Sequence, residues 1–291
     1  MIGNHHFGNV GDVWKHLLTC AILDEERPDR FWETHAGAAR YAMDEADERQ
    51  FGAGRYLARS RDVPALDSAT YTTLFSEAND SRTDPETYLG SPALAMGVLG
   101  DAADYYFFDV DPGCLDSIRE EASRRDCSSA VNAVPADGLS GVAAGIAADG
   151  DGTDVVHVDP FETFAATDPA GLTPIELFAD VAARGDVALL WYGFESAEAI
   201  ERRWEHVREE VREQLDDASS AWCGELALEA PANHGLSTDP GLVGSHLLCA
   251  GLSPETEQRC RELGDAIAAA YDHGDFPGDQ RGGLSFTVRT P

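Results

Sequence analysis

Lysine is almost absent from this chain of 291 residues: lysine and arginine together number 21, and Lys15 is the one lysine among them. Aspartate and glutamate number 53, so the net charge at pH 7 is −32. The acids are spread along the whole chain, which argues against an acidic interaction tail. Spread carboxylates with so little lysine are typical of adaptation to concentrated salt, because hydrated carboxylates keep the surface soluble while ions screen their repulsion. The alternative is an acidic protein adapted to ordinary salt.

Salt is therefore expected to decide whether the chain folds. At a net charge of −32, carboxylate repulsion is unscreened in about 10 mM KCl, where the Debye length is about 30 Å, and screened in molar KCl, where it is about 3 Å. We expect circular dichroism to show a folded protein only at the higher salt. A spectrum that is the same in both would remove the halophilic interpretation. It would also restore the usual expectation that a protein that binds nucleic acid has a basic face. Concentrated salt removes that requirement, because it weakens contacts with phosphate.

Paired cysteines and long apolar runs are missing as well. No two cysteines have the C-x-x-C spacing of a redox or zinc site. The sequence also has no signal peptide and no apolar run of membrane-spanning length. It therefore predicts a soluble cytoplasmic protein without a metal site or a membrane partner. The cysteines are predicted to be buried free thiols in a reducing compartment, at Cys20, Cys114, Cys127, Cys223, Cys249 and Cys260.

Glycine motifs that bind phosphate are also absent. A nicotinamide dinucleotide needs G-x-G-x-x-G in the first strand–helix turn, so that its pyrophosphate can approach the helix N-terminus. The segments "HAGAAR" (35–40) and "FGAGRY" (51–56) both lack that pattern. No G-x-x-x-x-G-K-[ST] occurs, which excludes a P-loop. S-adenosylmethionine contains no pyrophosphate and needs only a loosened turn, which Gly37 can provide.

The chain does contain a repeated alternation of strand-like and helix-like segments. This alternation predicts an α/β domain with a mainly parallel sheet and helices on both faces. Residues 1–291 are predicted to form a single domain, and the polar segment at about 44–88 predicts a small helical insertion with one helix around "YTTLFSEA". Helices are predicted at 12–26, 91–100, 113–125 and 195–215. Strands are predicted at 30–35, 105–111, 130–138, 154–161, 187–194, 223–230, 245–252 and 284–289. The first helix is expected to have one apolar face, formed by Val13, Leu17, Leu18, Ala21 and Ile22.

Acidic residues follow three of these strands. Asp109 or Asp111 follows the second strand, Asp137 the third and Asp159 the fourth, whereas "THAG" follows the first. Parallel sheets bind ligands at the carboxyl ends of their strands. A carboxylate at the second strand end can accept both ribose hydroxyls, and one at the third can accept an adenine amino group. A single such Asp is better explained by a turn or a helix cap, but three in register favour a nucleoside site.

Six motifs occur in a fixed order: "GNVGDVWKH", "ETHAGAARY", "YLGSPALA", "PADG", "VDPFE" and "LLWY". In this order and spacing they resemble the ribosomal large-subunit RNA adenine-N6 methyltransferases of the RlmJ type, from about residue 5 to the last strand. The first two motifs together are specific, whereas "PADG" or "LLWY" alone would mean little. The resemblance implies a class I, Rossmann-like methyltransferase fold, S-adenosylmethionine as the cofactor and ribosomal RNA as the partner.

The resemblance also implies site residues. In the family, the segments similar to "KH", "THAG" and "GSP" line the cofactor pocket. Carried over residue by residue, the implied cofactor-binding residues are His16, His35, Ser91, Asp109, Asp137, Gly138 and Asp159. Gly37 is added to them because it can provide the loosened turn.

Lys15 is added to this set because it lies beside the implied pocket, where its ammonium can meet a ligand carboxylate or a target phosphate. The alternative is a solvent-facing lysine on the first helix.

The predicted catalytic residues are Asp159, Pro160 and Phe161. The family's Asp-Pro-Pro-Tyr box followed by Glu appears here as Asp-Pro-Phe-Glu, one proline shorter. The Asp159 carboxylate and the Pro160 carbonyl are expected to accept the two N–H groups of an exocyclic amine and so localise its lone pair toward the methyl group. Phe161 is expected to stack on an everted base.

Four other functions stay open. Asp-Pro-Phe also resembles the box of methyltransferases that act on the exocyclic amine of guanine, and the same type of box serves DNA adenine methyltransferases. A shortened box is also compatible with a protein that binds S-adenosylmethionine without catalysis. A nicotinamide oxidoreductase is the most distant alternative, because the G-x-G-x-x-G motif is missing.

Overall fold

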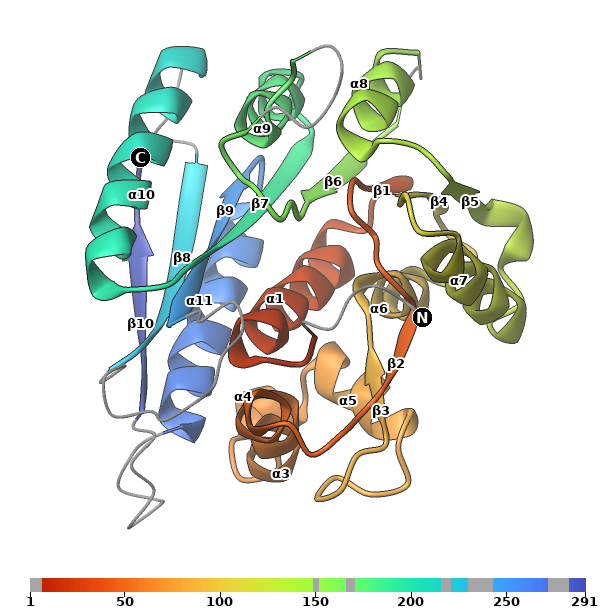
Figure 1. Ribbon diagram of the computed structural model, residues 1–291, viewed down its shortest axis with the longest axis vertical. Coiled ribbons are helices and arrows are strands. Elements are labelled where there is room, and N and C mark those ends of the chain that lie inside the picture. Colours follow the sequence, from red (N-terminus) through yellow and green to blue (C-terminus); the bar gives the residue numbers. More distant parts are fainter. Residues whose placement is uncertain (1–6, 149–151, 166–170, 216–220, 230–242, 272–282) are drawn as a thin grey trace.

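The computed structural model describes residues 7–148, 152–165, 171–215, 221–229, 243–271 and 283–291. Its centre is an eight-stranded sheet with the strand order β10-β8-β9-β7-β6-β1-β4-β5 (Figure 1). The main strands are β1 (Arg30–Glu33), β4 (Asp104–Phe108), β5 (Val131–Val134), β6 (Asp154–Val158), β7 (Val187–Phe194), β8 (Ala221–Leu228), β9 (Gly244–Ala250) and β10 (Leu284–Arg289). A separate two-stranded sheet pairs β2 (Arg40–Ala42) with β3 (Thr87–Leu89).

The strand directions define the fold class. Strands β5, β4, β1, β6 and β7 are parallel, whereas β9 is antiparallel to both β7 and β8 and therefore lies between two strands of the opposite direction. This is the sheet of the class I, Rossmann-like methyltransferase fold, with β10 added antiparallel to β8 at the edge. The predicted fold class is confirmed.

Both faces of the sheet are buried. In β1, Phe31 belongs to one hydrophobic cluster and Trp32 to another. In β6, Val155 belongs to the same cluster as Phe31, and Val156 to the same cluster as Trp32. Because successive strand side chains point to opposite faces, the two clusters are the two helical layers. One layer contains α1 (Val10–Glu26), α5 (Thr70–Glu77), α6 (Ser91–Leu99), α7 (Pro112–Arg124) and α11 (Pro254–Ala270). The other contains α8 (Gly138–Ala148), α9 (Pro174–Ala183) and α10 (Ala197–Gln214).

Local sequence signals account for several helix starts. Asp111 precedes Pro112 and accepts a hydrogen bond from the Gly113 amide at the start of α7. Ser196 accepts one from Ala199 at the start of α10, and each such cap is worth about 1 kcal/mol. The strand predicted at 105–111 ends at Phe108, so the residues that follow it are free to form the loop at the sheet edge.

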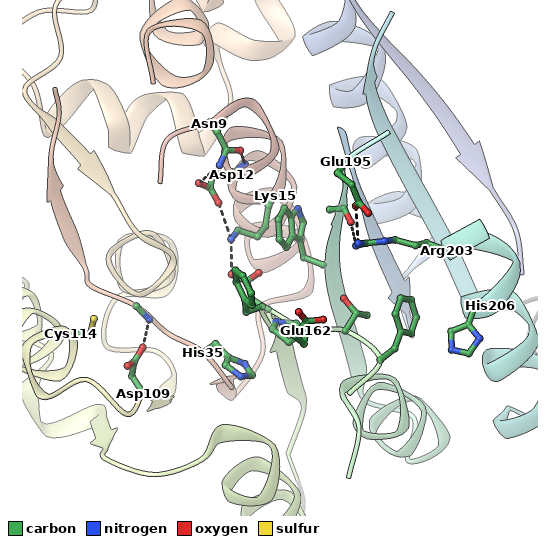
Figure 2. A pocket seen from close by; sticks show the side chains of 18 of the residues that line it. Asn9, Asp12, Lys15, His35, Asp109, Cys114, Glu162, Glu195, Arg203 and His206 are labelled. Atoms are coloured by element: carbon green, nitrogen blue, oxygen red, sulfur yellow. Dashed lines mark hydrogen bonds and ion pairs between the residues drawn. The ribbon is translucent and has the colours of Figure 1, made fainter. Parts of the chain in front are cut away.

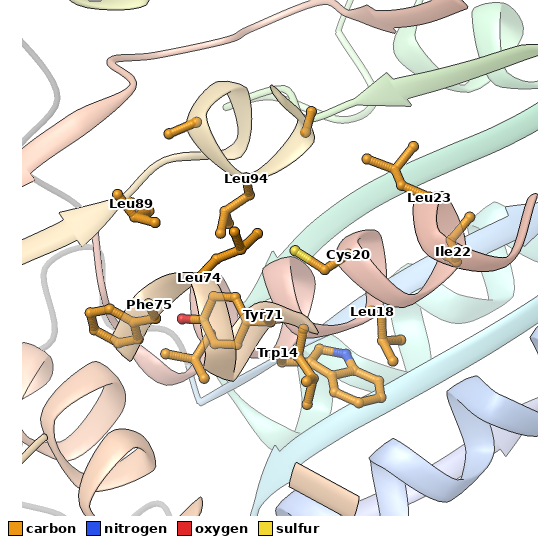
Figure 3. Close-up of a cluster of buried hydrophobic side chains, with 14 of the residues drawn as sticks. Trp14, Leu18, Cys20, Ile22, Leu23, Tyr71, Leu74, Phe75, Leu89 and Leu94 are labelled. Carbon is orange, nitrogen blue, oxygen red and sulfur yellow. The ribbon is translucent and has the colours of Figure 1, made fainter. Parts of the chain in front are cut away.

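Helix α1 is buried on all sides over most of its length, rather than on the single apolar face that its sequence predicts. Every residue from Gly11 to Cys20 is buried, and the helix packs against α5, α6, α11 and β9. Its outer side is covered by the segment that contains α2 (Asp47–Arg49), η1 (Gln50–Gly54), α3 (Arg55–Ser60), α4 (Pro64–Asp67) and α5. Figure 3 shows Tyr71 and Phe75 of α5 in the same cluster of buried side chains as Trp14 and Leu18 of α1. Lys15 and His16 are buried as a result.

The six cysteines are free and buried, as predicted. Burial raises the pKa of the Cys114 thiol to about 12, with Asp109 adding to the effect, so that thiol is not a nucleophile near neutral pH. No helix in the part of the chain that the structure describes is long and apolar enough to cross a membrane.

Candidate active site

A cavity of about 890 Å³ lies at the carboxyl ends of the parallel strands and opens beside the start of α1 (Figure 2). It is at the large end of the range for small-molecule sites. Its wall includes the start of α1, the loops after β1, β4 and β6, the end of β7, and α10. Of the residues predicted from sequence, those that line it are Lys15, His35, Gly37, Asp109, Asp159, Pro160 and Phe161.

Lys15 joins the start of α1 to the end of β6. Asn9 caps α1 by accepting a hydrogen bond from the Asp12 amide, and its side-chain amide donates to Asp12 Oδ2 at 3.1 Å. The other oxygen of Asp12 is 3.2 Å from Lys15 Nζ, which also donates to Asp159 Oδ2 at 2.6 Å. The ring centroid of Trp191 in β7 lies 4.9 Å from the same ammonium. The interpretation of Lys15 as a solvent-facing residue is wrong, and its ionic partners here are two carboxylates of the chain itself.

Burial and charge fix the ionisation of this group. Burial alone would raise the pKa of Asp159, but Lys15, together with His157 and His35, outweighs burial, so the pKa of Asp159 lies below its usual value. Burial raises the pKa of Asp12, only partly offset by Lys15. Burial also disfavours the charged form of Lys15, but the two carboxylates raise its pKa above the ordinary value. Asp159 is therefore held as a carboxylate at the edge of the cavity.

The loops after β1 and β4 are tied to each other. Gly37 has φ of +62°, a conformation that glycine adopts without strain, and its amide donates to Asp109 Oδ2 at 2.8 Å. The other oxygen of Asp109 accepts from the Asp111 amide at 2.7 Å. His35 shares a 2.8 Å hydrogen bond with Thr34 Oγ1, and burial lowers the pKa of His35. Asp109 keeps unused lone pairs for a ligand hydroxyl, since a carboxylate has about four acceptor sites.

His16 and Ser91 line a smaller hollow of about 40 Å³ next to the main cavity, together with Tyr41 and Tyr88. His16 Nδ1 is 2.8 Å from the Tyr88 hydroxyl, and burial keeps the pKa of His16 well below its usual value. Because Lys15, His35, Gly37 and Asp159 border both spaces, the hollow is an extension of the main cavity.

Asp137 and Gly138 line neither space within the described residues. Asp137 Oδ1 accepts hydrogen bonds from the amide and hydroxyl of Ser140 at 3.1 and 2.9 Å, which makes it the cap of α8. Gly138 lies so close to the Thr34 carbonyl that a Cβ would overlap it. These contacts position α8 against the loop after β1, and a cofactor-binding role of the pair stays a prediction.

The shortened box places its aromatic residue in solvent. Phe161 is 82% exposed and lines the cavity next to Pro160. A single exposed apolar side chain is ordinary on a protein surface, so the feature that distinguishes Phe161 is its position at the wall of the cavity. Phe164, three residues later, also lines the cavity and packs edge-on against His206 of α10, with ring centroids 4.6 Å apart.

Sequence reasoning missed several residues of the site. Asp12 and Trp191 lie inside the motifs "GNVGDVWKH" and "LLWY", so the motifs located them without giving them a role. Arg202, Arg203 and His206 face the cavity from α10, but they lie in a highly charged helix where no local signal separates them from solvent-facing residues.

A second missed feature lies beneath the cavity. His157 Nδ1 is 2.7 Å from Glu33 Oε1, and both side chains are fully buried. The two residues are register partners on the parallel strands β1 and β6, immediately before Thr34 and near Asp159. Burial raises the pKa of Glu33. This pair supports the loops that carry the site.

Comparisons with known proteins identify the fold. No family model matches this chain, and no curated protein sequence matches it. Among solved structures, protein LPL1258 from Legionella pneumophila, described with the family model DUF519, has a TM-score of 0.74 at 17% identity and covers 98% of both chains. Cofactor-bound Rv0187 from MTB has a TM-score of 0.40 at 11% identity, covering 86% of this chain and 84% of that one. The chain is thus similar in fold to the Legionella protein over almost its whole length.

Proposed function

We propose that this protein transfers a methyl group from S-adenosylmethionine to an exocyclic amino nitrogen of a nucleic-acid base, with adenine N6 of ribosomal RNA as the substrate. The observation that supports this most is the state of Asp159. Its carboxylate borders the cavity, is kept ionised by Lys15 at 2.6 Å, and lies two residues before the exposed ring of Phe161.

The charge of the cavity fits this cofactor. Its strand-end side is lined by Asp12, Asp109, Asp111 and Asp159, with Lys15 already committed to two of these carboxylates. S-adenosylmethionine supplies a methyl group on a cationic sulfur. A sulfonium and an ammonium are stabilised among these carboxylates, whereas a pyrophosphate would be repelled by them. The same argument disfavours a nicotinamide dinucleotide.

The reaction needs positioning more than it needs a strong base. An exocyclic amine is a weak nucleophile because its lone pair is conjugated with the ring. Asp159 and the Pro160 carbonyl can accept its two N–H groups and localise the lone pair. When the carbon–nitrogen bond forms and the carbon–sulfur bond breaks, the nitrogen carries a surplus proton, which Asp159 can accept and release to water. Phe161 can stack on the base, at roughly 1–3 kcal/mol per base.

Removing the Asp109 carboxylate is expected to abolish most cofactor binding. The demethylated product, S-adenosylhomocysteine, should raise the melting temperature of the wild type by mass action, at roughly 2.7 kcal/mol for a concentration of 100 Kd. Asp109→Ala should lose most of that shift, because the ribose hydroxyls lose their acceptor. The measurement is the ligand-induced shift, not the melting temperature itself, since Asp109 also braces Gly37.

Asp116→Ala is the matched control, because it removes one carboxylate at an exposed position of α7. It should keep the full shift. If neither S-adenosylmethionine nor its product binds the wild type in molar salt, the cofactor is misassigned.

The activity is tested by mass spectrometry of ribosomal RNA nucleosides from cells with and without this protein. Loss of one N6-methyladenosine in its absence would support the proposal. In vitro, RNA and DNA of the same sequence should be compared, since DNA methylation alone would assign a DNA methyltransferase. Cofactor binding without methyl transfer to either polymer would instead indicate a binding protein with an inactive box.

A further inference from the structure

One end of the cavity is lined by acidic side chains, whereas Arg202 and Arg203 of α10 line the other end beside Glu195, with Glu162 on the wall between them. Figure 2 shows Asp109 and Cys114 at one end, Lys15 in between, and Arg203 and His206 at the other end, on α10. The acidic end is the one that suits the cofactor. Two arginines at one end of a cavity are unexpected in a chain with 53 acidic and 21 basic residues, and the cofactor assignment uses neither of them.

The α10 end of the cavity is built on one turn of that helix. Arg203 donates to the Gly193 carbonyl and, at 2.8 Å, to Glu195 Oε2, and these two acceptors at the end of β7 fix the orientation of its guanidinium. Arg202 is exposed and, within the described part of the chain, has no hydrogen-bond or ion-pair partner. His206 lies one turn further along and contacts Phe164. Arg202 is therefore an exposed guanidinium at the cavity wall whose donors are available to a ligand, beside a second guanidinium held by Glu195 and on a wall that also carries the Glu162 carboxylate.

The position of this turn indicates its ligand. A base whose amine meets Asp159 and whose ring meets Phe161 must carry its sugar and phosphate away from the cofactor. The α10 end of the cavity is on that side, since Phe164 joins the loop after β6 to His206. A guanidinium binds phosphate oxygens through its planar fork of donors.

We propose that Arg202, supported by Arg203 and His206, forms a phosphodiester subsite that binds the nucleic-acid backbone next to the base presented to Asp159. The proposal rests on the proposed function for the placement of the base. It adds the residues that distinguish a polynucleotide from a free base. Arg202 is a positioning residue, because it acts on the backbone and not on the reacting atoms.

The test is equilibrium binding of a short fluorescent single-stranded RNA, measured by anisotropy in the presence of S-adenosylhomocysteine. Arg202→Gln should weaken binding about tenfold, the loss expected for one hydrogen bond to a charged group. The slope of log affinity against log salt should fall by about 0.7 for one lost contact to a single strand. The titration is run over the KCl range in which circular dichroism shows a folded protein.

Arg212→Gln is the matched control, because it removes one exposed arginine from the last turn of the same helix, outside the cavity. It should change affinity and slope little. Heat of S-adenosylhomocysteine binding, measured by calorimetry, checks that each variant is folded. DNA of the same sequence and inorganic phosphate as a competitor show whether the subsite recognises the RNA backbone, any phosphodiester or a free anion.

The outcomes separate this subsite from the proposed function. If Arg202→Gln and Arg212→Gln lower affinity equally, or if the wild type binds no RNA or DNA, the subsite does not exist. If only Arg202→Gln weakens binding but the wild type methylates neither polymer, the subsite stands and the methyltransferase proposal fails.

Discussion

Asp159→Asn is expected to lower methyl transfer per folded molecule at least about a hundredfold, the usual loss when a preorganised electrostatic contact is removed. The amide keeps an acceptor oxygen for the substrate amine but loses the negative charge, and it can present a competing donor. Lys15 retains Asp12 at 3.2 Å, so the variant should fold. Binding of S-adenosylmethionine should persist, and bound cofactor can be used to count folded molecules in the assay.

Asp180→Asn is the control for this variant, since it removes a carboxylate that is exposed on α9. Its activity should equal that of the wild type. Full activity in Asp159→Asn would refute the mechanism, because Asp159 would then be only a structural partner of Lys15. No activity in the wild type on any RNA or DNA would favour the non-catalytic alternative.

Lys15→Met is expected to destabilise the protein by roughly 3–5 kcal/mol near neutral pH, the usual result of leaving buried charges without their partner. The side chains of Asp12 and Asp159 are only 11% and 14% exposed. Without the ammonium, burial and their mutual repulsion would raise both pKa values above those in the unfolded chain. The measurement is the free energy of unfolding by denaturant at constant molar salt.

The pH dependence distinguishes this cause from loss of packing. In the variant, carboxylates with raised pKa values favour folding at low pH, and that stability is lost as pH rises above their unfolded value of about 3.9. In the wild type, the lowered pKa of Asp159 contributes stability above that value, and the contribution is lost as the pH falls. The deficit of Lys15→Met should therefore grow from acid to neutral pH.

A neutral triple variant, Lys15→Met with Asp12→Asn and Asp159→Asn, provides the control. It removes every charge of the group while keeping side chains of similar size, so it should recover most of the lost stability. A deficit that is the same at all pH values and persists in the triple variant would mean that Lys15 acts through packing alone.

Much of the fold could be predicted from the sequence. Apolar runs such as those of β6 and β7 are long enough for buried strands, and their alternation with helices leaves few arrangements of the sheet. The residues after β1, β4 and β6 could likewise be placed at one edge, because parallel strands end on the same side. His35, Gly37, Asp109 and Asp159 accordingly line one cavity.

Other features depend on contacts between distant segments. The burial of α1 could not be predicted from its own pattern, because the segment at 47–77 covers its outer side. Asp137 follows its strand as Asp109 does, yet caps α8, since a carboxylate binds whichever donors the local backbone presents.

The sequence by itself determined the parallel α/β architecture, the strand-end acids and the position of the one lysine, because these follow from local periodicity and chain order. The tertiary structure alone decided what these residues contact. It pairs Lys15 with Asp159, 144 positions away, and turns Arg202 of α10 toward the cavity. Ionisation and side-chain direction depend on burial and on neighbours brought together by folding, and no local pattern encodes those neighbours.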